Sequence, residues 1–143
     1  SSKAASSGDS SKAASSGHYS TAASSGHFSK AASSGHFSKA ASSGHSSTAA
    51  SSGHYSTAAS SGNYSKAASS GDSSKAACDT NGFACVAGIN GCVKGNAGSA
   101  LSLGYKNKDG KNRIAIGYVG EEGIKADTWY VATDKGELKE AST

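Results

Sequence analysis

The chain has 143 residues and a formal net charge of +4, and 35% of its residues are apolar. Most of the apolar residues are alanine, and every Val, Ile and Leu follows Cys78, so a conventional hydrophobic core is excluded for the first half. The lysines are spread along the chain and no apolar run is long enough to span a bilayer, so we expect neither nucleic-acid binding nor membrane insertion.

A nine-residue repeat fills residues 1–77. Eight complete copies of the SSKAASSGH type follow one another without insertion, and a ninth breaks at Cys78. Six positions never change, while position one is Ser, Tyr or Phe, position three is Lys or Thr, and position nine is Asp, His or Asn. A flexible linker would tolerate changes anywhere, whereas this pattern is typical of stacked units that contact each other through fixed small residues.

The repeat predicts an all-β fold, a narrow parallel β-solenoid. Side chains alternate between the two faces of a strand, so the variable positions one and three share the outer face and the small residues at positions two and four share the inner face. The Ser-Ser-Gly at positions six to eight has turn chemistry. Because Ala and Ser fill little volume, the interior has to be thin.

One repeat per coil is favoured over two. Position three matches between neighbouring copies in four of eight pairs and between next-but-one copies in one of seven. If like residues stack on like, the neighbouring copies are the ones in contact.

After the repeats we expect transition coils over 78–98, with cysteines at seven-residue spacing, and a C-terminal β-hairpin or meander cap over 99–143. The large aliphatic residues predict a hydrophobic core that ends the rod. Cys78, Cys85 and Cys92 have neither the spacing of a zinc site nor an even count, so we expect them to share one face as small packing residues. The alternative is one disulfide and one free thiol.

Two sets of side chains are candidate sites. If one repeat makes a coil, the histidines form a column with about 4.8 Å between rungs, which makes them weak candidates for metal ligands, although no metal or other cofactor is expected. The metal candidates are His18, His27, His36, His45 and His54. The candidate interaction surface is an outward aromatic column, interrupted at Ser46 and formed by Tyr19, Phe28, Phe37, Tyr55 and Tyr64.

The units SSKAASSG and YSTAASSG, with the closing IKADTWYVATDKGELKE, resemble a family of poorly characterised tandem-repeat proteins of phages, prophages and gut-type bacteria. That resemblance implies a very narrow parallel β-solenoid with a small C-terminal module, on a phage virion or in or on a bacterial cell. It carries over no functional residue. A weaker similarity is to the Ser-, Ala- and Gly-rich β-rolls of trimeric autotransporter adhesins.

No phosphate-binding loop or nucleophile motif is present, so we expect a structural protein, a rigid spacer or fibre segment, and not an enzyme. The sequence names no partner, and self-association or fibre assembly is one option. One alternative is a surface module that binds a glycan or protein through the aromatic and Lys/Thr face. Ice binding is a weaker alternative, because only Thr21, Thr48 and Thr57 occupy position three among six lysines.

Overall fold

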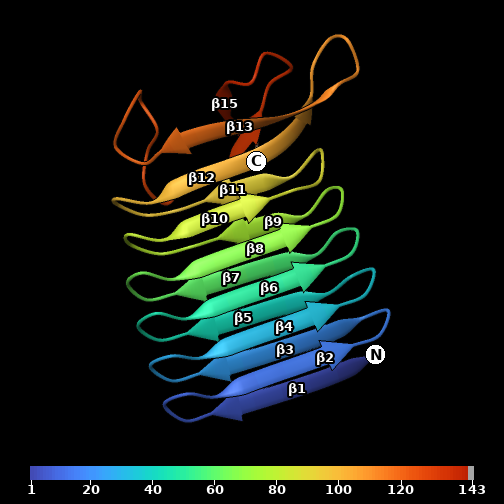
Figure 1. The fold of residues 1–143 in the computed structure, drawn as a ribbon, viewed down its shortest axis with the longest axis vertical. Coiled ribbons are helices and arrows are strands. Elements are labelled where there is room, and N and C mark those ends of the chain that lie inside the picture. Colours follow the sequence, from blue (N-terminus) through green and yellow to red (C-terminus); the bar gives the residue numbers. More distant parts are fainter. Residues whose placement is uncertain (142–143) are drawn as a thin grey trace.

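The computed structural model, which describes residues 1–141, is a rod of two stacked β-sheets with antiparallel strands at its C-terminal end (Figure 1). Sheet A has the order β1-β3-β5-β7-β9-β11-β14-β15, and sheet B the order β13-β12-β10-β8-β6-β4-β2. The repeat strands are β1 (Ser2–Ser7), β2 (Lys12–Ser16), β3 (Ser20–Ser25), β4 (Lys30–Ser34), β5 (Lys39–Ser43), β6 (Thr48–Ser52), β7 (Thr57–Ser61), β8 (Lys66–Ser70) and β9 (Lys75–Ala77). The remaining strands are β10 (Phe83–Val86), β11 (Cys92–Lys94), β12 (Ala100–Lys106), β13 (Asn112–Tyr118), β14 (Tyr130–Ala132) and β15 (Leu138–Glu140).

The predicted parallel β-solenoid is confirmed, but each coil contains two repeats and not one. Successive repeats form strands in opposite sheets, so β1 pairs in parallel with β3, and Ser2 lies beside Ser20, eighteen residues later. The preference for one repeat per coil was therefore wrong. That preference assumed that like residues stack on like. The assumption fails for lysine, because like charges directly opposite each other on neighbouring strands are destabilising.

Position three shows this effect directly in sheet A. Its column runs Lys3, Thr21, Lys39, Thr57 and Lys75, so a threonine separates every two lysines. In sheet B, Thr48 separates Lys30 from Lys66, and only Lys12 and Lys30 are adjacent lysines. The rarity of matches between next-but-one copies thus follows from two repeats per coil.

The interior of the repeat region contains only Ala and Ser, as the alternation predicted. From Ser20 onward the serines at position two and the alanines at position four are buried, while the alanines at position five lie outside. Serines reach across the rod and bond directly, with 2.7 Å between the Oγ atoms of Ser20 and Ser33 and 2.8 Å between those of Ser38 and Ser51. Because side chains this short bridge the sheets, the sheets lie closer than the roughly 10 Å of ordinary packing.

These buried hydroxyls are satisfied. Ser38 also donates from its Oγ to the Ser52 carbonyl, and no buried side-chain nitrogen or oxygen within residues 1–141 lacks a partner. The interior is therefore a chain of hydrogen bonds as well as an apolar layer, which avoids the cost of burying unpaired polar groups.

The hydrogen-bond ladder continues through the turns, where glycine is required. The Gly26 amide donates to the Ser43 carbonyl and the Phe28 amide to the Asp9 carbonyl, at 3.1 and 2.7 Å. Gly44 has φ +124°, and a Cβ on it would lie 1.8 Å from the Gly26 carbonyl oxygen. From Gly26 onward each turn of the repeats thus stacks on the preceding one with no room for a side chain at position eight.

Past Ala77 the coil shortens and the core changes. Lys66 now lies beside Phe83, seventeen residues later, and β10 and β11 continue the parallel stacking. Larger buried side chains fill this part of the rod: Val86, Val93, Leu101 and Leu103. One continuous apolar cluster joins them to the alanines of the repeats.

The expectation that the three cysteines share a face was wrong. All three are free thiols, with Cys78 buried, Cys85 exposed on the outer face of sheet B and Cys92 half-buried in sheet A. A seven-residue step is close to half of a seventeen-residue coil, so it takes the chain from one sheet to the other.

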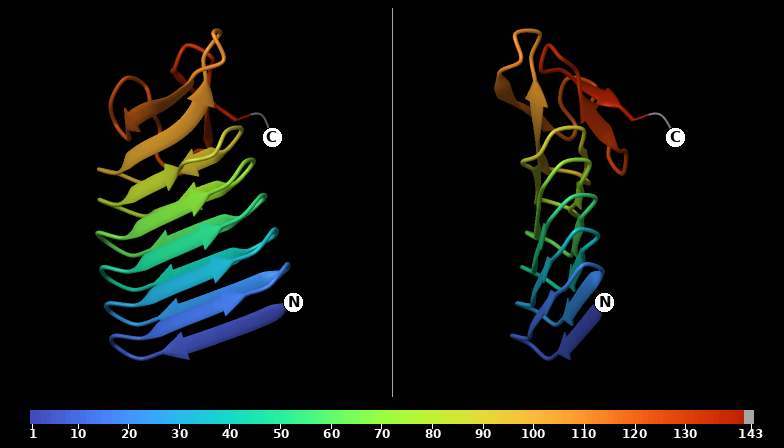
Figure 2. Two further views of the ribbon diagram at one scale, coloured as in Figure 1. Left: turned by 45° about the vertical axis from the view of Figure 1, so that its right-hand side comes forward. Right: turned by 90° about the vertical axis from the view of Figure 1, so that its right-hand side faces the viewer.

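The C-terminal hairpins are antiparallel, as predicted. β12 pairs with β13, while β14 pairs with both β11 and β15, so that the ends of both sheets carry antiparallel strands (Figures 1 and 2). Not all the large aliphatics join the core here, because Ile114 and Ile116 on β13 point outward and are 69% and 60% exposed. The inward positions of β13 are small because a Cβ on Gly117 would lie 2.3 Å from Leu138 Cδ1.

Candidate interaction surfaces

The turns of the repeats form the two narrow edges of the rod, and the candidate His and aromatic residues are divided between them. Even-numbered strands end in turns on one edge, which carries His18, His36 and His54 beside Tyr19, Phe37 and Tyr55. Odd-numbered strands end on the other edge, which carries His27 and His45 beside Phe28, Ser46 and Tyr64. The single column expected from the sequence is thus two shorter columns.

On the first edge the aromatic rings stack on one another. The centroids of Tyr19 and Phe37 are 5.1 Å apart and those of Phe37 and Tyr55 are 5.5 Å apart, with nearly parallel planes. Because each ring faces its neighbour in the next coil, the faces of Phe37 are covered. Rings stacked in this way form a ladder that stabilises successive coils. They do not offer the open ring face on which a sugar would stack.

On the second edge Ser46 interrupts the ladder. Phe28 and Tyr64 are about two rungs apart, with the hydroxymethyl group of Ser46 between them. Both rings are more than half exposed, at 55% and 59%. Of the aromatic surface predicted from sequence, this is the part where ring faces are not covered by a like ring in the next coil.

Four of the five histidines stack face to face in two pairs, and the ring of His54 is tilted by 39° against that of His36. The imidazole centroids of His18 and His36 are 5.2 Å apart at an interplanar angle of 3°, and those of His27 and His45 are 5.0 Å apart at 9°. The lone pairs of an imidazole lie in the ring plane, so parallel stacked rings direct them side by side and not toward a common point. Within residues 1–141 no group of three or more His, Cys, Asp or Glu side chains is arranged to hold a metal ion.

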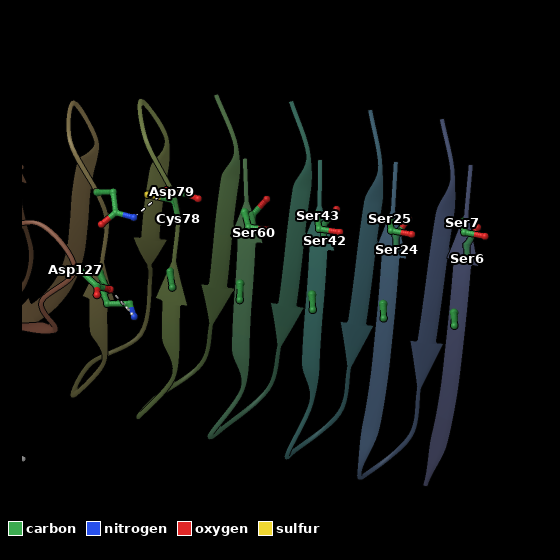
Figure 3. A pocket seen from close by; sticks show the side chains of 18 residues that line it. Ser6, Ser7, Ser24, Ser25, Ser42, Ser43, Ser60, Cys78, Asp79 and Asp127 are labelled. Carbon is green, nitrogen blue, oxygen red and sulfur yellow. Dashed lines mark hydrogen bonds and ion pairs between the residues drawn. The ribbon is translucent and has the colours of Figure 1, made fainter. Parts of the chain in front are cut away.

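The outer face of sheet A carries a shallow open depression along the rod. Its floor repeats Ala at position five and Ser at position seven, so that Ser7, Ser25 and Ser43 recur on successive strands (Figure 3). It ends at Lys94, whose Nζ lies 3.1 Å from an Asp127 carboxylate oxygen and 5.2 Å from the Trp129 ring centroid.

Asp79 also lines this end of the depression, and its carboxylate has a structural role. It accepts hydrogen bonds from Asn96 Nδ2 and the Thr80 amide, both at 2.8 Å. These contacts, the bond from Asn96 first, lower the pKa of Asp79, while burial raises the pKa of the neighbouring Cys78 thiol. A thiol held in its neutral form is a poor nucleophile.

The outer face of sheet B has a similar depression lined by Ala and Ser, which continues to Cys85 and Ala87. At the C-terminal end of this face lie four exposed large apolar side chains: Phe83, Ile114, Ile116 and Tyr118. Sequence reasoning missed this surface. The alternation in residues 112–118 indicates one face with large residues and one with small residues, but the large residues were expected to face inward.

The threonines do not form an array. Thr21 and Thr57 are in sheet A and Thr48 is in sheet B, and each lies between lysines in its column. No flat surface of adjacent threonines exists among the described strands, so the geometry lends no support to ice binding.

No protein-family model, curated protein or solved structure matches the chain. Within the described residues, no helix is long and apolar enough to cross a membrane. What the structure itself offers is a regular rod, two edges of stacked rings and two flat faces.

Proposed function

We propose that this chain is a structural protein, a rigid rod that sets the distance between whatever is joined to its ends. The observation that carries the proposal is the unbroken parallel ladder from β1 to β11 in sheet A and from β2 to β12 in sheet B. Every coil bonds to the next through strands, turns and buried serine hydroxyls, so bending the rod at any one coil would break several hydrogen bonds at once.

The C-terminal hairpins act as a cap in this proposal. An open end of stacked parallel strands presents unpaired backbone groups to other chains. β13 and β14 pair with the last parallel strands in the opposite direction, which prevents a further coil of the same kind from stacking there. The resemblance to repeat proteins of phages and bacteria supports a place on a virion or cell surface, where a spacer of this kind would serve.

Distance measurements between spin labels test the rod. In a variant without native cysteines, labels at the exposed positions Ser16 and Ser70 lie three rungs apart on sheet B, about 14 Å. Inserting four further eighteen-residue coils between them should lengthen the distance to about 34 Å without broadening its distribution. Labelled chains are diluted with unlabelled ones, so that only distances within one chain are measured.

The control inserts a Gly/Ser linker of the same length at the same place. Such a linker gives either a broad distribution that scales with the square root of its length or, where the two halves of the rod stack again with the linker looped out, the original distance of about 14 Å. If the repeat insertion broadens the distribution as the linker does, the chain is not a rigid spacer.

A further inference from the structure

The apolar surface at the C-terminal end of sheet B has no partner within residues 1–141. Phe83 on β10 and Ile114, Ile116 and Tyr118 on β13 are each at least half exposed, and β12 lies between these two strands. Of the nine large apolar side chains that are exposed in the described part of the chain, the other five are all on the narrow edges. The described strands of sheet A carry no comparable surface, since Lys94, Asp127 and Trp129 occupy the same end.

The outward residues of sheet B form three columns, which we call the large, central and small columns. The large column contains Lys12, Lys30, Thr48, Lys66, Phe83, Ala100 and Tyr118. The central column contains Ala14, Ala32, Ala50, Ala68, Cys85, Ser102 and Ile116. The small column contains Ser16, Ser34, Ser52 and Ser70, then Gly104 and Ile114.

We propose that this face binds the same face of a second copy of the chain, with a two-fold axis that runs along the rod, so that the two rods are parallel. Such an axis exchanges the large and small columns and leaves the central column facing itself. Ile116 then meets Ile116 of the other copy, and Tyr118 meets Ile114. Ile114, Ile116 and Tyr118 of each copy are thus buried by the same three side chains of the other, while Phe83 meets the small column at the level of β10.

Charge and contact area together select this orientation. The outward positions of β2, β4, β6 and β8 include lysines and no acidic residue. A two-fold axis across the middle of the rod would place the lysine column of one copy on that of the other, which is repulsive, and an axis across the apolar end would pair only the last strands and bury a smaller area. The axis along the rod places each lysine opposite serines.

The shape of the face also favours parallel rods. A depression beside the central column lies on the side of the small column. Its lining includes Cys85, Ala87, Gly104 and Ile114, together with the charged Asp72, Lys106 and Arg113. The two-fold axis along the rod places Phe83 of the other copy over the small column, at the level of β10. An aromatic ring is thereby placed over small residues, and the exposed apolar patch of each copy leaves water.

The area of this face determines how strongly the two copies are expected to bind each other. Seven strands at about 4.8 Å and three outward positions give a face of roughly 30 by 15 Å, so that pairing buries on the order of 1,000 Å² in total. This is near the lower limit for a specific interface. We therefore expect a reversible dimer whose population rises with protein concentration, whether or not the rod acts as a spacer.

Cys85 reports the arrangement, because this exposed thiol lies in the central column next to the axis. Mild oxidation of the full chain should give a disulfide-linked dimer that is lost in Cys85→Ser and retained in Cys92→Ser. In the Cys85→Ser chain, Ala32→Cys should restore the cross-link, since only parallel rods place this position opposite itself. Failure of Ala32→Cys to cross-link while Cys85 does would overturn the parallel arrangement.

Sedimentation over a concentration series tests the surface itself. Ile116→Lys changes a side chain that is 60% exposed, so folding should be retained while the dimer population falls at least tenfold. The matched control is Phe28→Lys, 55% exposed on the edge of the rod, which should leave the dimer unchanged. A chain that stays monomeric at millimolar concentration, or a dimer insensitive to Ile116→Lys, refutes the proposal.

Discussion

Single residues in the rod are constrained by volume, and Ala40 shows how tightly. It is 2% exposed on β5, in an interior where the serines of facing sheets already bond across the rod. A side chain with three more carbons has no space unless the two sheets separate, which would also lengthen the serine hydrogen bonds. Packing and polar satisfaction are therefore coupled at each buried position.

We expect Ala40→Leu to destabilise the protein by about 3 kcal/mol through overpacking. Ala41→Leu is the matched control, because Ala41 is the next residue of the same strand but lies on the outside. Thermal unfolding followed by circular dichroism should show a lower midpoint for the first variant and almost no change for the second. Equal midpoints for the two variants would contradict the inward and outward assignment.

Among the elements, neighbouring strands restrict each other's outward residues through charge. The column of position three in sheet A places Thr57 between Lys39 and Lys75. At a strand spacing of about 4.8 Å, a third lysine here would meet two others. The threonines are thus explained by their neighbours in the next coil, which are eighteen residues away in sequence.

Thr57→Lys should cost about 1 kcal/mol at low salt, and most of the charge-dependent part of this loss should disappear at high salt. Ser43→Lys is the control, since Ser43 on β5 lies between Ser25 and Ser61 and meets no lysine in its column. Unfolding midpoints measured at 10 mM and 500 mM salt separate the charge-dependent part of the loss of stability from the part that does not depend on charge. A loss that is the same at both salt concentrations would show that repulsion between coils is not its cause.

For the whole molecule, the sequence predicted the solenoid and its inner face because the size and polarity of the side chain at most of the nine positions are the same in every repeat. Alternation and fixed small residues were enough to assign Ala40 to the interior and Lys39 to the outside. Coil size was not predictable by matching like with like, because stacked lysines repel. The apolar face of sheet B was missed because the inward side of β13 has room only for residues such as Ala115 and Gly117 beside Leu138.

Modularity is the remaining property of the whole rod that can be tested. Every repeat carries the same inner residues, so removing residues 28–36 lets the later repeats keep their stacking while the N-terminal strands exchange sheets. This deletion should retain a β-sheet spectrum and cooperative unfolding, with a midpoint within a few degrees of the parent. Deleting Ala32 alone reverses the alternation within β4 and should cost about 2 kcal/mol or more. If the nine-residue deletion is as damaging as the loss of one residue, the rod is not built from interchangeable half-coils.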